Sequence, residues 1–361
     1  MLTNWRGLIL LAAIILASLP PVAAQQSKEI LLSQTENAYN PVPNADGTVV
    51  AYVRTGWNRP GGSGGFGRSN LRSEVMLMNT NGLLLIKEPI ADAFLTGWTS
   101  DGKSLICYRD WFYSLVSSDG TVKKQIDAPE GFPPKTDRPE RVSYLSDMDS
   151  FLWVKSGQKE SSIEAGGQTI ARADFKLGDI IVPSPNERYI AVTAGFGHDL
   201  WVYDRRNKAW TNLGESIISP SDDWGYISPS WNPWFADSSR LTFVSRTGVI
   251  VSSPDGKTRQ LLARPSLKVG LATPSPDGQL VAYMTFEPQP MKIRPDLKFW
   301  GGTTVWLVPT SGPNPARRIT EKNKDTTYCL RWLNDRQLVL DRVADEDFYS
   351  KARLWRIDVL R

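Results

Sequence analysis

The sequence predicts an all-β protein that folds as a single β-propeller of seven four-stranded blades. Three observations lead to this prediction: a hairpin motif that recurs seven times, a second strand pair after most copies, and an unpaired strand at each end of the array. Seven repeats over residues 25–361 give about 48 residues each, which is the blade size of propellers. A β-sandwich does not repeat at this spacing. Six blades plus an embellishment is the alternative count, because the third repeat is the least regular.

The recurring hairpin has an aromatic residue or proline, two further residues, Asp or Asn, usually Gly, and then a β-rich run. Its copies are PNADGTVVAY, WTSDGKSLICY, YLSDMDSFLWV, PSPNERYIAV, WFADSSRLTF, PSPDGQLVAY and WLNDRQLVL. Asp-Gly favours the positive φ that a tight hairpin turn requires. The alternation after the turn places pairs such as Leu105 and Cys107 on one face of a strand. Each copy therefore predicts a hairpin that begins one blade.

Most copies are followed by an apolar strand, a polar turn and another short strand, as in YSLVSSDGTVKKQI and VIVSSPDGKTRQLL. In the third repeat we place these outer strands at SSIEAGG and QTIARA. The last repeat ends at LWRIDVLR, which leaves its outermost strand unsupplied, and KEILLSQ near the start resembles that strand. Because open sheet edges invite aggregation, we predict that residues 30–33 pair with residues 354–359 and close the ring.

The first 24 residues have the layout of a secretory signal peptide. Arg6 precedes a 12-residue apolar run from Leu8 to Leu19, which is followed by a Pro-Pro break and small residues up to Ala24. An uncleaved anchor is the disfavoured alternative, since a membrane span needs about 20 apolar residues. We predict cleavage after Ala24, a propeller domain over residues 25–361, no membrane insertion after cleavage, and a bacterial periplasmic or secreted location.

Composition excludes several other classes of protein. Of the 361 residues, 41% are hydrophobic and 22% are charged, which excludes a disordered, collagen-like or polytopic membrane protein. Lys and Arg total 42 against 38 Asp and Glu, so the net charge of +4 is too small for a protein that binds nucleic acid by charge. We therefore predict no nucleic-acid partner. Two cysteines exclude a disulfide framework.

The hairpin motif resembles the repeat of the TolB-type (WD-like) β-propeller family, most closely at PNADGTVVAY and PSPDGQLVAY. The resemblance covers essentially all of residues 25–361. It implies an exported scaffold that binds a partner, often a protein. TolB itself has an additional N-terminal α/β domain, for which we expect no room before Asp46. Only the propeller type is therefore transferred, and not the role of TolB.

Two segments match catalytic motifs by chance of composition. Residues 97–104, GWTSDGKS, fit the phosphate-loop pattern, but that loop requires a following helix and here a β-rich run follows. Residues 61–65, GGSGG, match the nucleophile elbow, which requires a strained turn from a strand into a helix. The base for Ser63 would have to be the single histidine, His198, and nothing in the sequence brings the two together. We predict no catalytic residue.

No metal or cofactor is expected either. His198 has no partner histidine and no Cys pair at metal spacing, and the acidic runs 222–223 and 345–347 lack the spacing of a calcium loop. Cys107 is predicted on the second strand of the second blade and Cys329 on the first strand of the seventh. Because a disulfide requires Cα atoms within about 7 Å, we expect two buried thiols.

The lengths of the connections distinguish the two faces of the predicted ring. In a four-stranded blade, the first and third turns emerge on one face, while the second turn and the link to the next blade emerge on the other. The first and third turns are short here. The long connections all belong to the other kind: residues 55–70, 128–141, 194–199, 215–228, 286–302 and 343–352. Long loops on a rigid scaffold are where binding residues concentrate.

We call this second side the long-loop face and the first side the short-turn face. The candidate binding residues on the long-loop face are Trp57, Arg59, Phe66, Arg68, His198, Asp222, Asp223, Trp224, Arg294 and Trp300. Aromatic and Arg side chains anchor protein interfaces and can also stack on sugars. We predict a non-catalytic monomer that binds an envelope or extracellular protein, or a glycan. The alternative is a purely structural role, in which these loops only cover the mouth of the central channel.

An enzyme is the other alternative. Some relatives of the repeat that this chain resembles act on acidic sugars, so the resemblance allows a propeller-fold polysaccharide lyase or another carbohydrate-active enzyme. Such lyases use histidine-rich metal sites within the ring. The single histidine of this chain disfavours that alternative.

Overall fold

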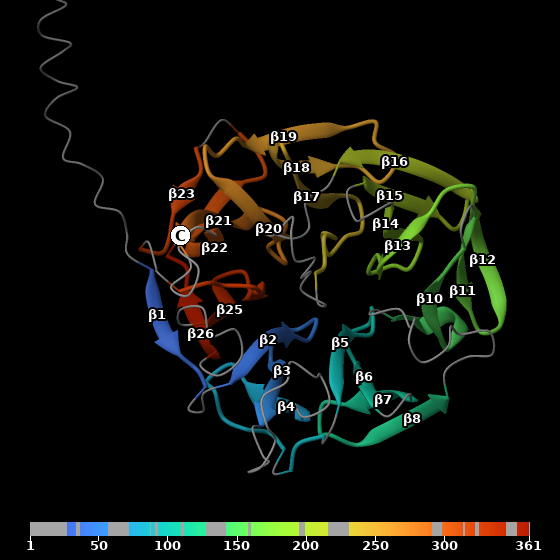
Figure 1. Ribbon diagram of the computed structural model, residues 1–361, viewed down its shortest axis with the longest axis horizontal. Coiled ribbons are helices and arrows are strands. Elements are labelled where there is room, and N and C mark those ends of the chain that lie inside the picture. Colours follow the sequence, from blue (N-terminus) through green and yellow to red (C-terminus); the bar gives the residue numbers. More distant parts are fainter. Residues whose placement is uncertain are drawn as a thin grey trace, which may run out of the picture.

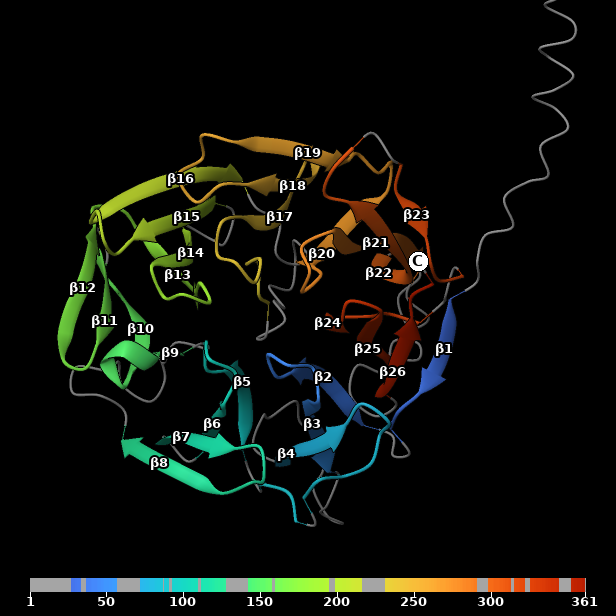
Figure 2. The ribbon, with the colours of Figure 1, turned by 180° about the vertical axis from the view of Figure 1, so that it is seen from behind.

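Seven antiparallel sheets arranged around a ring form the protein, as Figures 1 and 2 show for this computed structural model. The structure describes residues 27–33, 37–56, 72–86, 88–90, 93–109, 112–127, 142–157, 160–194, 199–215, 231–290, 298–312, 315–321, 325–343 and 352–360. The only helix in these ranges is the short 3-10 helix η2, Ser146–Met148. The seven-bladed propeller predicted from the repeats is therefore confirmed.

We number the blades in chain order. Blade 1 contains β2 (Ala38–Pro43), β3 (Val49–Gly56) and β4 (Arg72–Asn79); blade 2 contains β5 (Phe94–Trp98), β6 (Ser104–Arg109), β7 (Phe112–Ser117) and β8 (Val122–Asp127). Blade 3 contains β9 (Ser143–Leu145), β10 (Ser150–Ser156), β11 (Ser161–Ala165) and β12 (Gln168–Ala173). Blade 4 contains β13 (Leu177–Pro183), β14 (Tyr189–Ala194), β15 (Asp199–Asp204) and β16 (Ala209–Glu215). The outer strands predicted for the irregular third repeat are thus present as β11 and β12.

The remaining blades follow the same order. Blade 5 contains β17 (Leu241–Ser245), β18 (Gly248–Ser252) and β19 (Arg259–Ala263); blade 6 contains β20 (Lys268–Pro274), β21 (Leu280–Pro290), β22 (Lys298–Pro309) and β23 (Arg317–Arg318). In blade 5 the innermost position is marked by the single bridge between Trp234 and Leu241. In blade 1 the outermost position is marked by a bridge between Met78 and Leu84.

Blade 7 closes the ring with a strand from the other end of the chain. It contains β24 (Leu330–Asn334), β25 (Gln337–Val343) and β26 (Ala352–Asp358), and its fourth strand is β1 (Lys28–Leu31). Ile30 lies opposite Arg356, and Leu31 lies opposite Trp355. Figure 1 shows β1 beside β26, with the first and last colours of the chain side by side. The predicted closure is confirmed.

The hydrophobic core lies between neighbouring blades. The predicted pair Leu105 and Cys107 belongs to a cluster that also contains Val42 and Ala51, so it joins blade 2 to blade 1. A larger cluster extends from Ala191 in blade 4 to residues of blade 7. Alternation along each strand therefore buries one set of side chains against the preceding blade and the other set against the next.

The aromatic residue of the hairpin motif also links neighbouring blades. Where it is tryptophan, its indole Nε1 donates a hydrogen bond to a carbonyl oxygen in the preceding blade: Trp98 to Val42 at 2.8 Å, Trp234 to Val182 at 3.0 Å and Trp332 to Thr273 at 3.0 Å. Each acceptor comes directly before the proline at the same motif position, so a tryptophan repeat is paired with a proline repeat. The acceptors lie on innermost strands, whose other edge has no strand beside it.

Candidate functional site

The turns of the short-turn face are held by their own acidic residues. Asp46 Oδ1 accepts a hydrogen bond from the backbone N–H of Thr48 at 2.9 Å, and Asp101 Oδ1 accepts one from Lys103 N–H at 3.1 Å. The Thr48 hydroxyl also donates to Asp46, and these bonds hold the pKa of the Asp46 carboxyl below its usual value. The motif acid is thus occupied within its own hairpin, as expected for turns of this composition.

Lys103 belongs to one of these turns and not to a phosphate loop. Its side chain is 78% exposed and its Nζ lies 3.6 Å from Asp101 Oδ2. Gly97 lies on β5, and β6 begins at Ser104, so a strand follows where a phosphate loop requires a helix. The structure therefore confirms that GWTSDGKS is a hairpin.

Neighbouring short turns contact one another. The Asn186 backbone N–H donates to Ser238 Oγ at 3.0 Å, which joins blade 4 to blade 5. The Asp277 backbone N–H donates to Asp335 Oδ1 at 2.8 Å, which joins blade 6 to blade 7. These contacts occupy backbone N–H groups at the tips of two turns, so they join neighbouring blades on the short-turn face.

Two glycines show how closely the turns of blades 7, 1 and 2 approach. Gly47 has a φ of +70°, and a Cβ built on it would lie 1.6 Å from the carbonyl oxygen of Leu333. A Cβ on Gly102 would lie 2.4 Å from the Cβ of Ala45. The Gly of Asp-Gly is therefore required by the neighbouring blade as well as by its own turn conformation.

Glu187 joins the turns of blades 2, 3 and 4. Its carboxylate accepts hydrogen bonds from the backbone N–H of Ser146 at 2.8 Å, from that of Asp147 at 3.1 Å, and from the Ser100 hydroxyl. Burial acts to raise the pKa of Glu187, but the hydrogen bonds outweigh it and lower this pKa below the usual value of 4.5. Arg205 adds an ion pair with Asp147 at 2.9 Å. The sequence did not single out Glu187, which occupies the usual glycine position of the motif.

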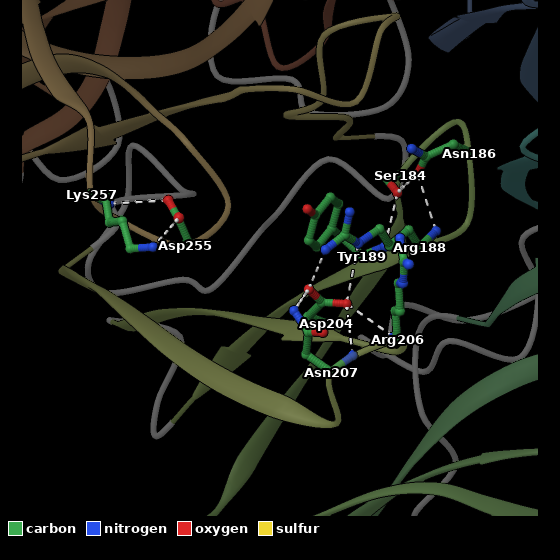
Figure 3. A network of polar contacts seen from close by, with 9 residues as sticks. All are labelled: Ser184, Asn186, Arg188, Tyr189, Asp204, Arg206, Asn207, Asp255 and Lys257. Carbon is green, nitrogen blue, oxygen red and sulfur yellow. Dashed lines mark hydrogen bonds and ion pairs between the residues drawn. The ribbon is translucent and has the colours of Figure 1, made fainter.

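A second carboxylate, Asp204, holds the third turn of blade 4 (Figure 3). Asp204 Oδ2 lies 2.8 Å from Nη2 of Arg188, and Asp204 Oδ1 accepts the backbone N–H of Arg206 at 2.9 Å. The hydrogen bond from Arg188 lowers the pKa of Asp204. The Arg188 guanidinium also lies over the ring of Tyr189, 4.7 Å from its centroid. These ionised groups on the short-turn face neutralise one another within the blade.

The long-loop face has a different character. Because neighbouring strands are antiparallel, β3, β14, β21 and β25 all end at the face opposite the short turns. The long connections therefore leave the ring on one side, as the sequence predicts. Most of their residues lie outside the described part of the chain, including Trp57, Arg59, Phe66, Arg68, His198, Asp222, Asp223, Trp224 and Arg294. Their binding role stays a prediction.

Trp300 requires a correction, because we placed it on a loop. The hairpin of blade 6 is longer than expected: β21 continues to Pro290 and β22 begins at Lys298. Trp300 lies on β22, opposite Pro288 on β21. The two prolines of EPQP predict a loop, but after a register shift between Thr285 and Glu287 the antiparallel pairing includes both prolines and ends at Pro290.

A cavity of about 360 Å³ lies between blades 5 and 6, and sequence analysis did not find it. The described residues that line it include Leu262, Arg264 and Leu267 from blade 5 and its link to β20, and Tyr283, Thr285 and Trp306 from blade 6. The only sequence signals were Tyr283, in PSPDGQLVAY, and Trp306, in VWLV. Both have the pattern of ordinary core residues, because the opposite wall of the cavity comes from another repeat.

The two cysteines are free and buried, as predicted. Burial raises the pKa of Cys107 to about 12, so its thiol stays protonated at neutral pH. Cys329 lies just before β24, next to the buried carboxylate of Asp341. Asp341 accepts hydrogen bonds from the backbone N–H groups of Asn40, Tyr328 and Cys329 at 2.8–3.0 Å. These contacts connect blade 7 to blade 1.

Within the described ranges, no group of three or more His, Cys, Asp or Glu side chains is placed to hold a metal ion. Among the same residues, no helix is long and apolar enough to cross a membrane. The acidic runs 222–223 and 345–347 and the GGSGG segment lie outside these ranges.

Comparison with known proteins supports the fold. A chain in the crystal structure of a mitotic checkpoint complex matches with a TM-score of 0.53 and 10% identity, over 94% of this chain and 96% of that chain. Hydrazine synthase from Kuenenia stuttgartiensis matches with a TM-score of 0.43 and 14% identity over 70% of this chain and 76% of that one. The tricorn protease matches with a TM-score of 0.35 and 12% identity, over 84% of this chain and 28% of that chain. At these identities the first match shows the fold alone, and the other two carry no argument.

No family model matches the chain. No curated protein matches it either.

Proposed function

We propose that this chain is an exported, non-catalytic propeller that binds a protein or a glycan through its long-loop face. The observation that carries the proposal is the difference between the two faces. Turns of the short-turn face are joined to one another by hydrogen bonds and close backbone contacts, so several of their backbone groups are already used. The long connections leave from the opposite face, where a partner can be bound without disturbing the blades.

The proposal includes a TolB-type repeat and a periplasmic or secreted location. The motif copies PNADGTVVAY and PSPDGQLVAY support the first, and the apolar run from Leu8 to Leu19 supports the second. Mass spectrometry of the protein exported by a bacterial host should find its N-terminus at or within a few residues of Gln25. Membrane-bound protein that retains Met1 would exclude the signal peptide.

Aromatic substitutions on the proposed face test the binding role. We expect Trp224→Ala and Trp300→Ala each to weaken partner binding by about 2 kcal/mol, or roughly 30-fold in Kd, as for a buried aromatic anchor. The partner is isolated by affinity capture from the periplasm and medium of the exporting host, alongside a glycan array, and titrated against each variant.

Lys103→Ala is the matched control, because Lys103 lies on a turn of the short-turn face and its side chain is exposed. It should leave both binding and the melting temperature unchanged. Loss of binding in Lys103→Ala, with both tryptophan variants unaffected, would place the interface on the short-turn face.

A further inference from the structure

Two stacked aromatic side chains of blade 6 line the cavity between blades 5 and 6. Tyr283 on β21 and Trp306 on β22 are direct partners in the antiparallel register. Their ring planes are 8° apart and their centroids are separated by 6.4 Å, and Trp306 is the more exposed of the two. Trp306 Nε1 donates to Thr285 Oγ1 at 2.9 Å, which fixes the orientation of the indole. An indole held in this way suits contact with a flat or apolar group.

The phenol of Tyr283 supplies a buried polar group to this cavity. Tyr283 is 2% exposed, and burial raises its pKa to about 12, so it is a neutral hydrogen-bond donor at any physiological pH. Its hydroxyl is not one of the fully buried polar atoms that lack a partner among the described residues, and Tyr283 lines the cavity, so the hydroxyl is accessible to a ligand there. A phenol in this position can donate a hydrogen bond that fixes the orientation of a bound molecule.

The charged side chains around the cavity determine which sign of charge a ligand can have. Arg264 is exposed at the cavity and forms no ion pair with a described residue. None of the described residues that line the cavity is acidic; their polar side chains are Arg264 and the hydroxyl groups of Ser266, Tyr283 and Thr285. An amine would find no opposite charge here. A carboxylate would find a guanidinium, with which it forms strong charge-assisted hydrogen bonds.

We propose that this cavity binds a small molecule, or the last residue of a chain, that joins a flat apolar body to a carboxylate. The body lies against Trp306, and the carboxylate accepts hydrogen bonds from Arg264 and from the Tyr283 hydroxyl. A volume of about 360 Å³ is at the lower end of ligand cavities, which suits a single ring with a short acidic arm. Arg264 lies in the link from β19 to β20, which belongs to the long-loop face, but none of the candidate binding residues named for that face lines this cavity, so the proposal does not rest on the proposed function.

Isothermal titration with 3-phenylpropanoate and with its neutral amide, 3-phenylpropanamide, tests the charge requirement. We expect the acid to bind at least tenfold more tightly than the amide. Arg264→Gln should weaken binding of the acid about tenfold and remove the preference over the amide. Arg206→Gln is the matched control, since Arg206 is an exposed arginine on a turn of blade 4, and it should bind as the unchanged protein does.

The Tyr283 hydroxyl and the Trp306 indole are tested separately. Tyr283→Phe keeps the ring and should weaken binding of the acid about fivefold with an unchanged melting temperature, whereas Trp306→Leu should weaken binding of the acid and the amide alike. The peptide Gly-Gly-Phe with a free or an amidated C-terminus distinguishes the sources. Binding of the free peptide shows that the site accepts a chain end, and binding of 3-phenylpropanoate alone shows that it accepts only small acids.

Three outcomes would overturn the proposal: no binding of either acid at millimolar concentration, equal binding of acid and amide, or an unchanged Kd in Arg264→Gln. Because Arg264 is exposed, its substitution leaves the fold intact, so a negative result is interpretable. Failure here would leave the long-loop partner untouched, since that interaction is measured with different variants.

Discussion

Blade 4 and blade 7 are sheets of the same size that are assembled from the chain in different ways. Blade 4 takes β13 to β16 from one continuous stretch, residues 177–215, so each strand is tethered to the next by a turn or loop. Blade 7 takes three strands from residues 330–358 and its outermost strand from residues 28–31. No turn therefore connects β1 to the other strands of blade 7, and only noncovalent contacts hold it to that sheet.

The contacts of β1 are correspondingly strong. Arg342 donates to both carboxylate oxygens of Glu29, at 2.6 and 2.9 Å, and only 7% of the Arg342 side chain is exposed. In blade 4 the corresponding ion pair joins Arg188 and Asp204, with 36% of the Arg188 side chain exposed. The arginine of the blade 7 pair is therefore the better shielded from water, whereas its carboxylate is the more exposed, with 28% of Glu29 exposed against 15% of Asp204.

The sequence separation of the two partners in each ion pair explains why blade 7 requires more contacts. Glu29 and Arg342 are 313 residues apart, whereas Arg188 and Asp204 are 16 apart. Because the entropy of loop closure grows with the logarithm of length, the longer loop costs about 2–3 kcal/mol more to close. A ring closed by its two ends requires extra contacts at the seam, and the difference between the blades shows where they are.

The largest expected effect comes from removing the closing strand. A chain that begins at Gln34 loses β1, whose ladder hydrogen bonds contribute roughly 1 kcal/mol each, together with the burial of Leu32. We expect its free energy of unfolding, measured in urea, to fall by about 4 kcal/mol or more. A chain that begins at Ser27 is the control and should be unchanged. An equal stability of the two chains would contradict closure by β1.

The two ion pairs give the next test. Arg342→Met removes both hydrogen bonds from a buried guanidinium to the Glu29 carboxylate and should cost about 2–3 kcal/mol. Arg188→Met removes a more exposed guanidinium, and the Asp204 carboxylate keeps its hydrogen bonds from the backbone N–H groups of Arg206 and Asn207, so this change should cost at most about 1 kcal/mol. Urea unfolding of both variants measures the difference. Equal losses would show that the burial of Arg342 adds nothing to the stability of the closed ring.

The indole links should be equivalent in both parts of the ring. Trp234 donates to blade 4 and Trp332 donates from blade 7, both at 3.0 Å. Substitution of each by phenylalanine leaves a carbonyl unpaired and should cost about 1–2 kcal/mol. Trp201→Phe is the control for lost side-chain volume. Trp201 is stacked on Phe175, and its indole makes no hydrogen bond with the described residues. A smaller loss in Trp234→Phe than in this control would exclude the hydrogen-bond contribution.

The smallest effect should come from acid. The pKa of Glu187 is lower in the folded protein than its usual value of 4.5, so its contribution to stability is complete above that value. The contribution is then lost as the pH falls through the lower, folded pKa. The difference in free energy of unfolding between Glu187→Gln and the unchanged protein, measured in urea, should therefore become smaller as the pH is lowered from 6 to 3. A constant difference across that range would show that the Glu187 charge is not involved.

The site is less predictable than the fold. The cavity between blades 5 and 6 combines Arg264, which follows β19, with Tyr283 and Trp306 on two strands of the next blade. In the sequence, Arg264 has the pattern of a residue in a link between blades, and Tyr283 and Trp306 have the pattern of core residues. Trp300 shows the same limit, because the pairing of β21 with β22 continued through prolines that usually end a strand.

By itself the sequence determined the blade number, the position of each hairpin and the strand that closes the ring. Turn chemistry at Asp-Gly and two-residue alternation act over fewer than ten residues, so they are visible wherever they recur. Only the tertiary structure decided which blade each tryptophan donates to, how Glu187 joins three turns, and that Trp306 and Arg264 line one cavity. Those relations depend on distances between residues in different repeats, and such distances are set by the packing of whole blades, which no local pattern encodes.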